Sequence, residues 1–135
     1  MCWFLYGSVN EGVNQDDLDE IESERFCFRP HAQTGLKKKI NADDGEYRIR
    51  NAYCDCDTAV GKQDYDAPEL KELAEYIGDL RYVQNIEWVY ICKKLQGRQL
   101  KGQQINVCID DIDLVPFLAD MRIQCLYQIQ LCRSP

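Results

Sequence analysis

Apolar residues recur along this chain with the periods of both strands and helices. The first apolar run, residues 2–9, is nearly continuous and rich in aromatic side chains, and the turn-forming Asn10 and Gly12 follow it. Such a run is typical of a buried strand. Apolar and polar residues alternate at 47–53 and again at 121–132, which predicts two strands that each have one polar face.

The most regular helical pattern covers residues 67–80. Apolar side chains repeat there at intervals of three and four residues and predict one buried stripe, made of Leu70, Leu73, Ala74, Ile77 and Leu80. Asp66 is placed to cap this helix, Glu69 completes a pair like that of a capping box, and Pro68 falls in the first turn. We expect the stripe to pack against the sheet.

Weaker patterns complete the predicted fold. Strands are expected at 24–29, 86–95 and 104–109, a helix at 15–25, a helical turn capped by Asp113 at 114–119, and a loop at 31–45. The length of 135 residues is that of one domain. The sequence therefore predicts a single α+β domain over 1–135. Its single-layer antiparallel or mixed sheet has five or six strands, with two main helices on one face.

The apolar segments also limit where the protein resides. None approaches the ~18 residues that span a bilayer. The six apolar residues at the N-terminus have neither the basic flank nor the cleavage site of a signal peptide. We therefore expect no membrane contact and a cytoplasmic location, in which the eight cysteines stay reduced. Cys92, Cys108 and Cys125 lie in strand-like runs and are interpreted as small buried hydrophobes.

The net charge of −7 comes from one segment. Residues 1–24 hold seven acids and no Lys or Arg, and the rest of the chain is balanced; the acids are Glu11, Asp16, Asp17, Asp19, Glu20, Glu22 and Glu24. Such a segment can steer association with a basic protein. The alternative is a solvated helix face that aids solubility. Nucleic acid is not expected as a partner, because the one basic cluster, at 37–39, is short.

The most specific chemical motif is Cys54-Asp55-Cys56-Asp57. In an extended strand both sulfurs point to one side and both carboxylates to the other. Two thiolates this close can bind a soft metal ion such as zinc or copper(I), or act as a redox pair. A structural zinc site needs four ligands, and Cys2, Cys27 and His31 are the candidates for the remainder. The alternative is that both aspartates form turns after a strand.

Residue patterns typical of a catalytic site are weaker than the cysteine motif. Cys2 would be an N-terminal nucleophile only after removal of Met1, and His31 is the only histidine available for a Cys–His pair. The acids at 110, 111 and 113 could hold Mg²⁺ but are explained by turns and capping. We therefore predict a non-enzymatic binding protein with an acidic N-terminal surface. The alternatives are a thiol-based metal or redox protein and a small cysteine-dependent hydrolase. Dimerisation through the strand at 121–132 stays open.

Overall fold

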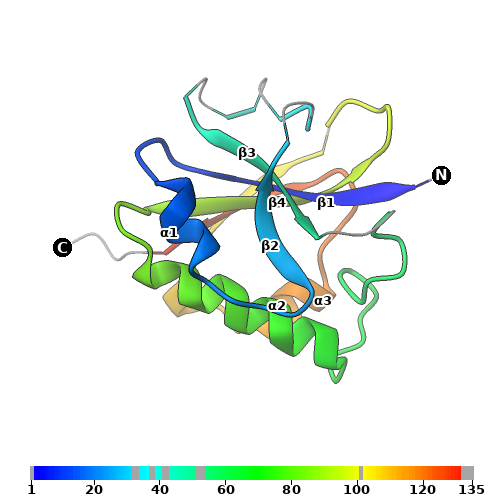
Figure 1. Cartoon of the computed structure of the whole chain (residues 1–135). Helices are drawn as coiled ribbons and strands as arrows, with labels where there is room; N and C mark the ends of the chain where they lie inside the picture. The colour runs from blue at the N-terminus through cyan, green and yellow to red at the C-terminus, as the bar shows by residue number, and fades with distance from the viewer. Residues whose placement is uncertain are drawn as a thin grey trace.

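The chain forms a six-stranded mixed sheet with its helices on one side (Figure 1). The strands are β1 (Trp3–Val9), β2 (Phe26–Pro30), β3 (Gly45–Arg50), β4 (Trp88–Leu95), β5 (Gln104–Cys108) and β6 (Leu126–Gln130). The helices are α1 (Gln15–Asp19), α2 (Pro68–Asp79), α3 (Leu114–Ala119) and the short 3₁₀ segments η1 (Leu80–Tyr82) and η2 (Ile109–Asp111). This computed structural model describes residues 2–31, 34–36, 39–40, 43–50, 54–100 and 102–131.

Strands β1 and β4 form the centre of the sheet. The strand order is β2-β3-β1-β4-β6-β5, and every neighbouring pair is antiparallel except the parallel pair β5–β6. Strand β1 pairs with β4 over its whole length, from Trp3 opposite Leu95 to Val9 opposite Val89. Its pairing with β3 is shorter and begins only at Tyr6. The first residues of β1 therefore need other partners on that side.

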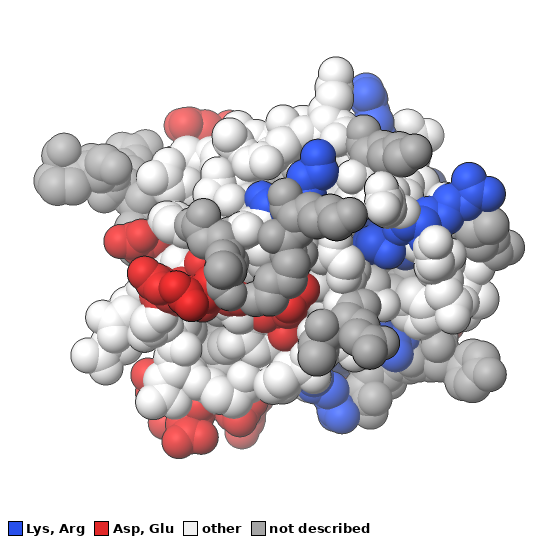
Figure 2. Space-filling model, turned by 90° about the horizontal axis from the view of Figure 1, so that it is seen from above, with Lys and Arg blue, Asp and Glu red and all other residues white. Residues whose placement is uncertain are grey.

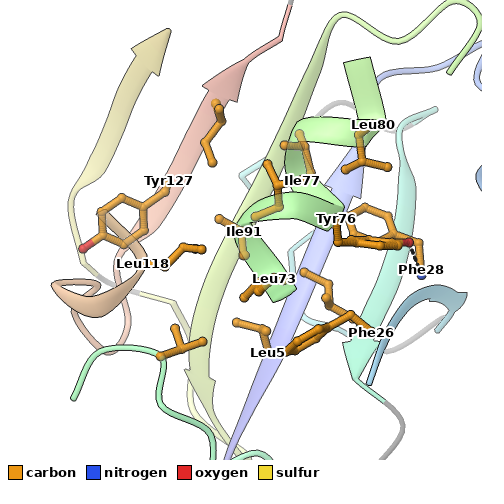
Figure 3. Close-up of a cluster of buried hydrophobic side chains, with 14 of the residues drawn as sticks. Leu5, Phe26, Phe28, Leu73, Tyr76, Ile77, Leu80, Ile91, Leu118 and Tyr127 are labelled. Carbon is orange, nitrogen blue, oxygen red and sulfur yellow. Dashed lines mark hydrogen bonds between the residues drawn. The ribbon is translucent and has the colours of Figure 1, made fainter. Parts of the chain in front are cut away.

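The main core lies between the sheet and helices α2 and α3, which lie together below it in Figure 1. The predicted stripe on α2 faces the sheet, and Leu70, Leu73 and Ile77 are fully buried. Figure 3 shows Tyr76 from the same helix beside Phe28 of β2, whose backbone N–H donates to the Tyr76 hydroxyl at 3.0 Å. The hydroxyl satisfies a buried donor at the edge of the core.

A second, smaller apolar cluster covers the opposite face of the sheet. Its buried members are Tyr6, Leu36, Ile40, Tyr90, Cys92, Leu100 and Leu126. Alternate residues of β1 and β4 point into the two clusters, as the two-residue period of a strand requires. The near-continuous apolar run at 2–9 follows from this arrangement, because β1 is covered on both faces.

The predicted α+β class, the mixed sheet and the two main helices on one face are confirmed. The predicted helix at 15–25 is too long, since α1 ends at Asp19. Beyond it, the Ser23 hydroxyl and the Arg25 amide both donate to the Glu72 carboxylate of α2, at 2.5 and 2.7 Å. These two bonds hold the segment extended and direct it into β2.

Of the two predicted helix caps, one is wrong and the other is confirmed in its position. The N-cap residue of α2 is Ala67 rather than Asp66, and no side chain caps the helix. Glu69 instead accepts from the Ala59 amide at 2.6 Å, so it holds a loop rather than the helix end. Asp113 occupies the N-cap position of α3 but makes no capping hydrogen bond there.

The predicted strand at 121–132 starts late, because β6 begins at Leu126. Gln124 has a positive φ of 63°, which interrupts an extended chain. Its side chain holds this bend by accepting from the Leu95 amide at 2.9 Å and donating to the Gln99 carbonyl at 2.8 Å. Strand β6 lies between β4 and β5, so the dimer pairing that the sequence left open for this segment is not available to its edges.

Some sequence predictions lie outside the described residues. These are residues 37 and 38 of the basic cluster and residues 51–53 at the end of the predicted strand 47–53. Within the described part of the chain, no helix has both the length and the apolar character needed to cross a bilayer.

Replacing Tyr76 by Phe tests the role of its hydroxyl in the core. The substitution leaves the buried Phe28 N–H without its acceptor, so we expect the free energy of unfolding to fall by about 1–3 kcal/mol. Urea unfolding measures the change. Tyr82→Phe is the matched control, because Tyr82 is 79% exposed. Equal stability of the two variants would contradict the prediction.

Candidate functional site

A turn at Cys54–Asp57 occupies the free edge of β1. The Asp55 amide donates to the Trp3 carbonyl at 3.1 Å, and the Trp3 amide donates to the Cys56 sulfur at 3.3 Å. The turn closes on itself through a bond of 3.1 Å from the Thr58 amide to the Asp55 carbonyl. The extended conformation considered for this segment is therefore wrong, and the alternative, a turn that follows a strand, is the one found. The turn takes the place of β3, which has separated from this end of β1.

The turn brings three sulfur atoms together. The Sγ atoms of Cys2, Cys54 and Cys56 all lie within 4.8 Å of one another, and each residue is half-buried. Cys2 comes from the residue before β1, so the cluster joins two segments that are more than fifty residues apart in sequence. Among the described residues, this is the only group of three or more potential metal ligands whose donor atoms meet.

The residue between the two turn cysteines anchors the cluster to the sheet. Asp55 is fully buried, and its Oδ2 accepts from the Leu5 amide at 2.7 Å. Its Oδ1 lies 3.6 Å from Arg48 Nη2 and 3.7 Å from Arg50 Nη1. Burial raises the pKa of Asp55, and the Leu5 amide and the two arginines oppose this shift without cancelling it.

Arg50 connects the turn with helix α2. Its Nη1 donates to Asp57 Oδ1 at 2.6 Å, and its Nη2 lies 3.8 Å from Glu69 Oε2. The hydrogen bond from Arg50 lowers the pKa of the exposed Asp57 carboxyl. Two carboxylates of the turn and one of the helix therefore surround one guanidinium, which fixes the position of the turn cysteines relative to the core.

The three thiols are not equivalent. The pKa of Cys54 is lowered by hydrogen bonds from the Cys56 amide, from the Cys56 thiol and from the Cys2 thiol. The pKa of Cys2 is raised, chiefly by its interaction with Cys54. Cys54 therefore loses its proton more readily than Cys2.

A buried cation lies close to the cluster. Lys93 is 5% exposed, and its Nζ lies 4.4 Å from the centre of the Trp3 ring. Burial lowers the pKa of Lys93, and the charge of Cys56 acts in the opposite direction. Gly61 lies against this ammonium with a φ of +75°, and a Cβ at this position would collide with Nζ. A side chain at 61 would therefore displace the cation from its place beside Trp3.

The remaining predicted ligands lie elsewhere. Cys27 is half-buried in β2, where its sulfur accepts from Arg29 Nε at 3.0 Å. His31 stacks on the Tyr6 ring with 5.5 Å between ring centres. Neither residue belongs to the cluster of three sulfurs, so the predicted set of Cys2, Cys27, His31, Cys54 and Cys56 is only partly brought together.

Sequence reasoning missed the residues that support the cluster. Arg48 and Arg50 alternate with apolar residues and were therefore assigned to a solvated face, whereas both lie beside the buried Asp55. Lys93 has one signal in the sequence, because it is a lysine within an apolar strand pattern. A charged residue at such a position is rarely buried unless something compensates it.

The spacing of the three sulfurs is suited to a soft metal ion. An ion 2.3 Å from each of three thiolates places the sulfurs about 4 Å apart. The observed limit of 4.8 Å therefore requires only small side-chain movements to close around an ion. No known protein family matches this chain, and no curated protein or solved structure is significantly similar to it.

Asp55→Asn tests the burial of the anchoring carboxyl through the pH dependence of stability. Because the folded protein raises the pKa of Asp55, protonation favours the folded state. The wild type should therefore gain stability relative to the variant as the pH falls from neutral through that raised pKa. Urea unfolding at pH values between 7 and 4 measures the difference.

Asp57→Asn is the matched control for this experiment and should show no such gain between pH 7 and 4. Arg50 lowers the pKa of Asp57 in the folded protein. The stability that the ionised carboxyl adds is therefore present above the pKa of Asp57 in the unfolded chain, and it is lost only as the pH falls below that value. If the stability of the wild type changed in the same direction relative to both variants as the pH falls, Asp55 would not be held in a desolvated environment.

Proposed function

We propose that this protein is a binding protein for one soft metal ion, held by the thiolates of Cys2, Cys54 and Cys56. The observation that carries the proposal is the meeting of their three sulfurs within 4.8 Å. Thiolates favour zinc and copper(I) among the biological metals. Zinc suits the site best, since it accepts three protein ligands and one further ligand from solution.

The charges around the cluster support this proposal. Deprotonation of three thiols creates three negative charges, and Arg50 and Lys93 lie close to the turn that carries two of them. Both cations favour the thiolate forms that a metal requires. The Trp3 amide adds a hydrogen bond to the Cys56 sulfur, and amide donors of this kind orient ligands and stabilise their charge.

The position of the cluster indicates an exchangeable ion rather than a structural one. The main core packs between the sheet and the helices; it contains neither Cys2 nor Cys54, and Cys56 only packs against its edge. The fold therefore does not depend on a metal ion, unlike that of a zinc finger. Three ligands leave one coordination position open for a solvent molecule or for a donor from a partner. We therefore infer that the protein carries or senses the metal without catalysing a reaction.

Reduced thiols are a condition of this function. The seven described cysteines are all free. A site of three thiolates persists where thiols stay reduced, so we infer a reducing compartment such as the cytoplasm.

Zinc titration of the reduced protein tests the proposed site. We expect one zinc ion to bind per chain, and Cys54→Ser to weaken binding at least ~100-fold, since even the loss of a supporting residue costs 10- to 100-fold. Competition with a chromogenic chelator measures the affinity, and cobalt(II) in place of zinc reports sulfur ligation by its absorption.

Cys27→Ser is the matched control, because Cys27 is also half-buried but belongs to another part of the sheet. It should bind zinc as the wild type does. Equal loss of zinc in both variants, or the absence of stoichiometric binding to the wild type, would refute the three-thiolate site.

A second proposed function uses the acidic segment as a surface for a basic protein partner. Six of its seven acids are exposed, and among the described residues none of the seven forms an ion pair. In Figure 2, which views the sheet face away from α2 and α3, acidic side chains gather at the left and basic ones mostly at the right. Such separation of charge favours oriented association.

Neutralising the acids around α1 tests the second function. Partners recovered on the immobilised chain are identified, and binding of the purified partner is then measured at two salt concentrations. Changing Asp16, Asp19 and Glu20 to amides should slow association and reduce its salt dependence. The control changes Glu75, Asp79 and Asp111, which lie in other elements. Unchanged association of the first variant would exclude the acidic surface.

A further inference from the structure

We infer that the three-cysteine cluster also reacts with hydroperoxides, and that the product is a disulfide between Cys54 and Cys2. The inference uses the site proposed above and adds its regulation, because a disulfide removes two of the three metal ligands. Two observations carry it: the meeting of the three sulfurs within 4.8 Å, and the attachment of the Cys56 sulfur to the Trp3 backbone.

Cys54 is the nucleophile because its sulfur lies beside those of Cys2 and Cys56 and, among the described contacts, is not attached to the main chain as the Cys56 sulfur is. The residue is half-buried, so a small oxidant can reach it. Cys92 shows the contrast within the same protein. It is fully buried in β4, and burial raises its pKa to about 12, which leaves it as an unreactive thiol.

Cys2 rather than Cys56 completes the disulfide. Cys56 is separated from Cys54 by one residue, and that residue, Asp55, is held to β1 through both its backbone and its side chain. The Cys56 sulfur is itself attached to the Trp3 backbone, 3.3 Å from the amide nitrogen, so it is not free to turn toward Cys54 and adopt the dihedral angle near 90° that a disulfide requires. Cys2 comes from another segment, so its sulfur can approach Cys54 without distorting the turn.

The reaction proceeds in two balanced steps. The Cys54 thiolate attacks the distal oxygen of the hydroperoxide, the O–O bond breaks, and the alkoxide or hydroxide leaves and takes a proton from water. Cys54 is then a sulfenic acid. The Cys2 sulfur attacks the Cys54 sulfur, the S–S bond forms, the S–O bond breaks, and the hydroxide takes the Cys2 proton to leave as water. Two thiols are oxidised and one peroxide is reduced.

Oxidation therefore controls metal occupancy. A disulfide sulfur is a poor ligand, and Cys56 alone cannot hold the ion with the affinity of three thiolates. Cellular thiols can reverse the change by thiol–disulfide exchange. The site is accordingly loaded under reducing conditions and emptied by peroxide.

Peroxide treatment of the reduced, metal-free protein followed by peptide mass spectrometry tests the inference. We expect two of the eight thiols to be lost and the peptides that contain Cys2 and Cys54 to be linked. In the Cys2→Ser variant, a dimedone adduct should form on Cys54 instead. Cys54→Ser and Cys54→Ala should form neither product, and the Cys27→Ser control should behave as the wild type.

The outcomes separate this inference from the proposed metal function. A Cys54–Cys56 bridge, oxidation confined to other cysteines, or no loss of thiols would overturn the inference. Zinc binding without a peroxide reaction removes the inference and leaves the metal site. The Cys2–Cys54 disulfide without zinc binding removes the metal site and supports the inference. In the zinc-loaded protein, peroxide should release one zinc ion per chain to a chromogenic chelator.

Discussion

The candidate site depends on the unpaired edge at the start of β1. Strand β3 pairs with β1 only from Tyr6 onward, so the Trp3 and Leu5 backbone groups on that side lack strand partners. Buried backbone groups need hydrogen bonds, and the turn at 54–57 provides them with its amide, a sulfur and a carboxylate. The same bonds that complete the sheet bring the turn cysteines next to Cys2. The local geometry of the cluster therefore follows from completing the sheet.

This edge is completed by charged groups rather than by a further strand. A buried carboxylate is costly unless it is hydrogen-bonded and paired, and Asp55 has one amide donor and two nearby guanidinium groups. Arg50 extends the network to Asp57 and Glu69, so the turn is attached to β1, β3 and α2 together. The position of the sulfurs is thus set by the ionic contacts around them. Apolar packing alone would fix the orientation of the turn less specifically.

Periodicity predicted most of the fold because the elements have strong apolar patterns. The α2 stripe and the alternation of Tyr47 and Ile49 in β3 report directly which faces are buried. The ends of elements were less predictable, because they depend on contacts between distant residues. Glu72 shortens the expected helix at 15–25, and Gln124 delays the start of β6. Neither effect has a local signal in the sequence.

The cysteine motif was recognisable from spacing, but its geometry was not. The interpretation of 54–57 as extended assumed that β3 continued, and it placed both aspartates on the side opposite the two sulfurs. The role of Asp55 depends on Leu5, fifty residues earlier, and on the point where β3 leaves β1. The meeting of Cys2 with the turn cysteines likewise depends on long-range pairing, which spacing alone does not reveal.

The place of Trp3 gives the protein a built-in optical reporter. Its indole ring lies against the Lys93 ammonium, and its backbone amide is bonded to the Cys56 sulfur. The other tryptophan, Trp88, packs against the smaller apolar cluster on the opposite face of the sheet. Events at the sulfurs should therefore alter the emission of one indole and leave the other as an internal reference. Light emitted by the native chain can follow this site in real time without an attached label.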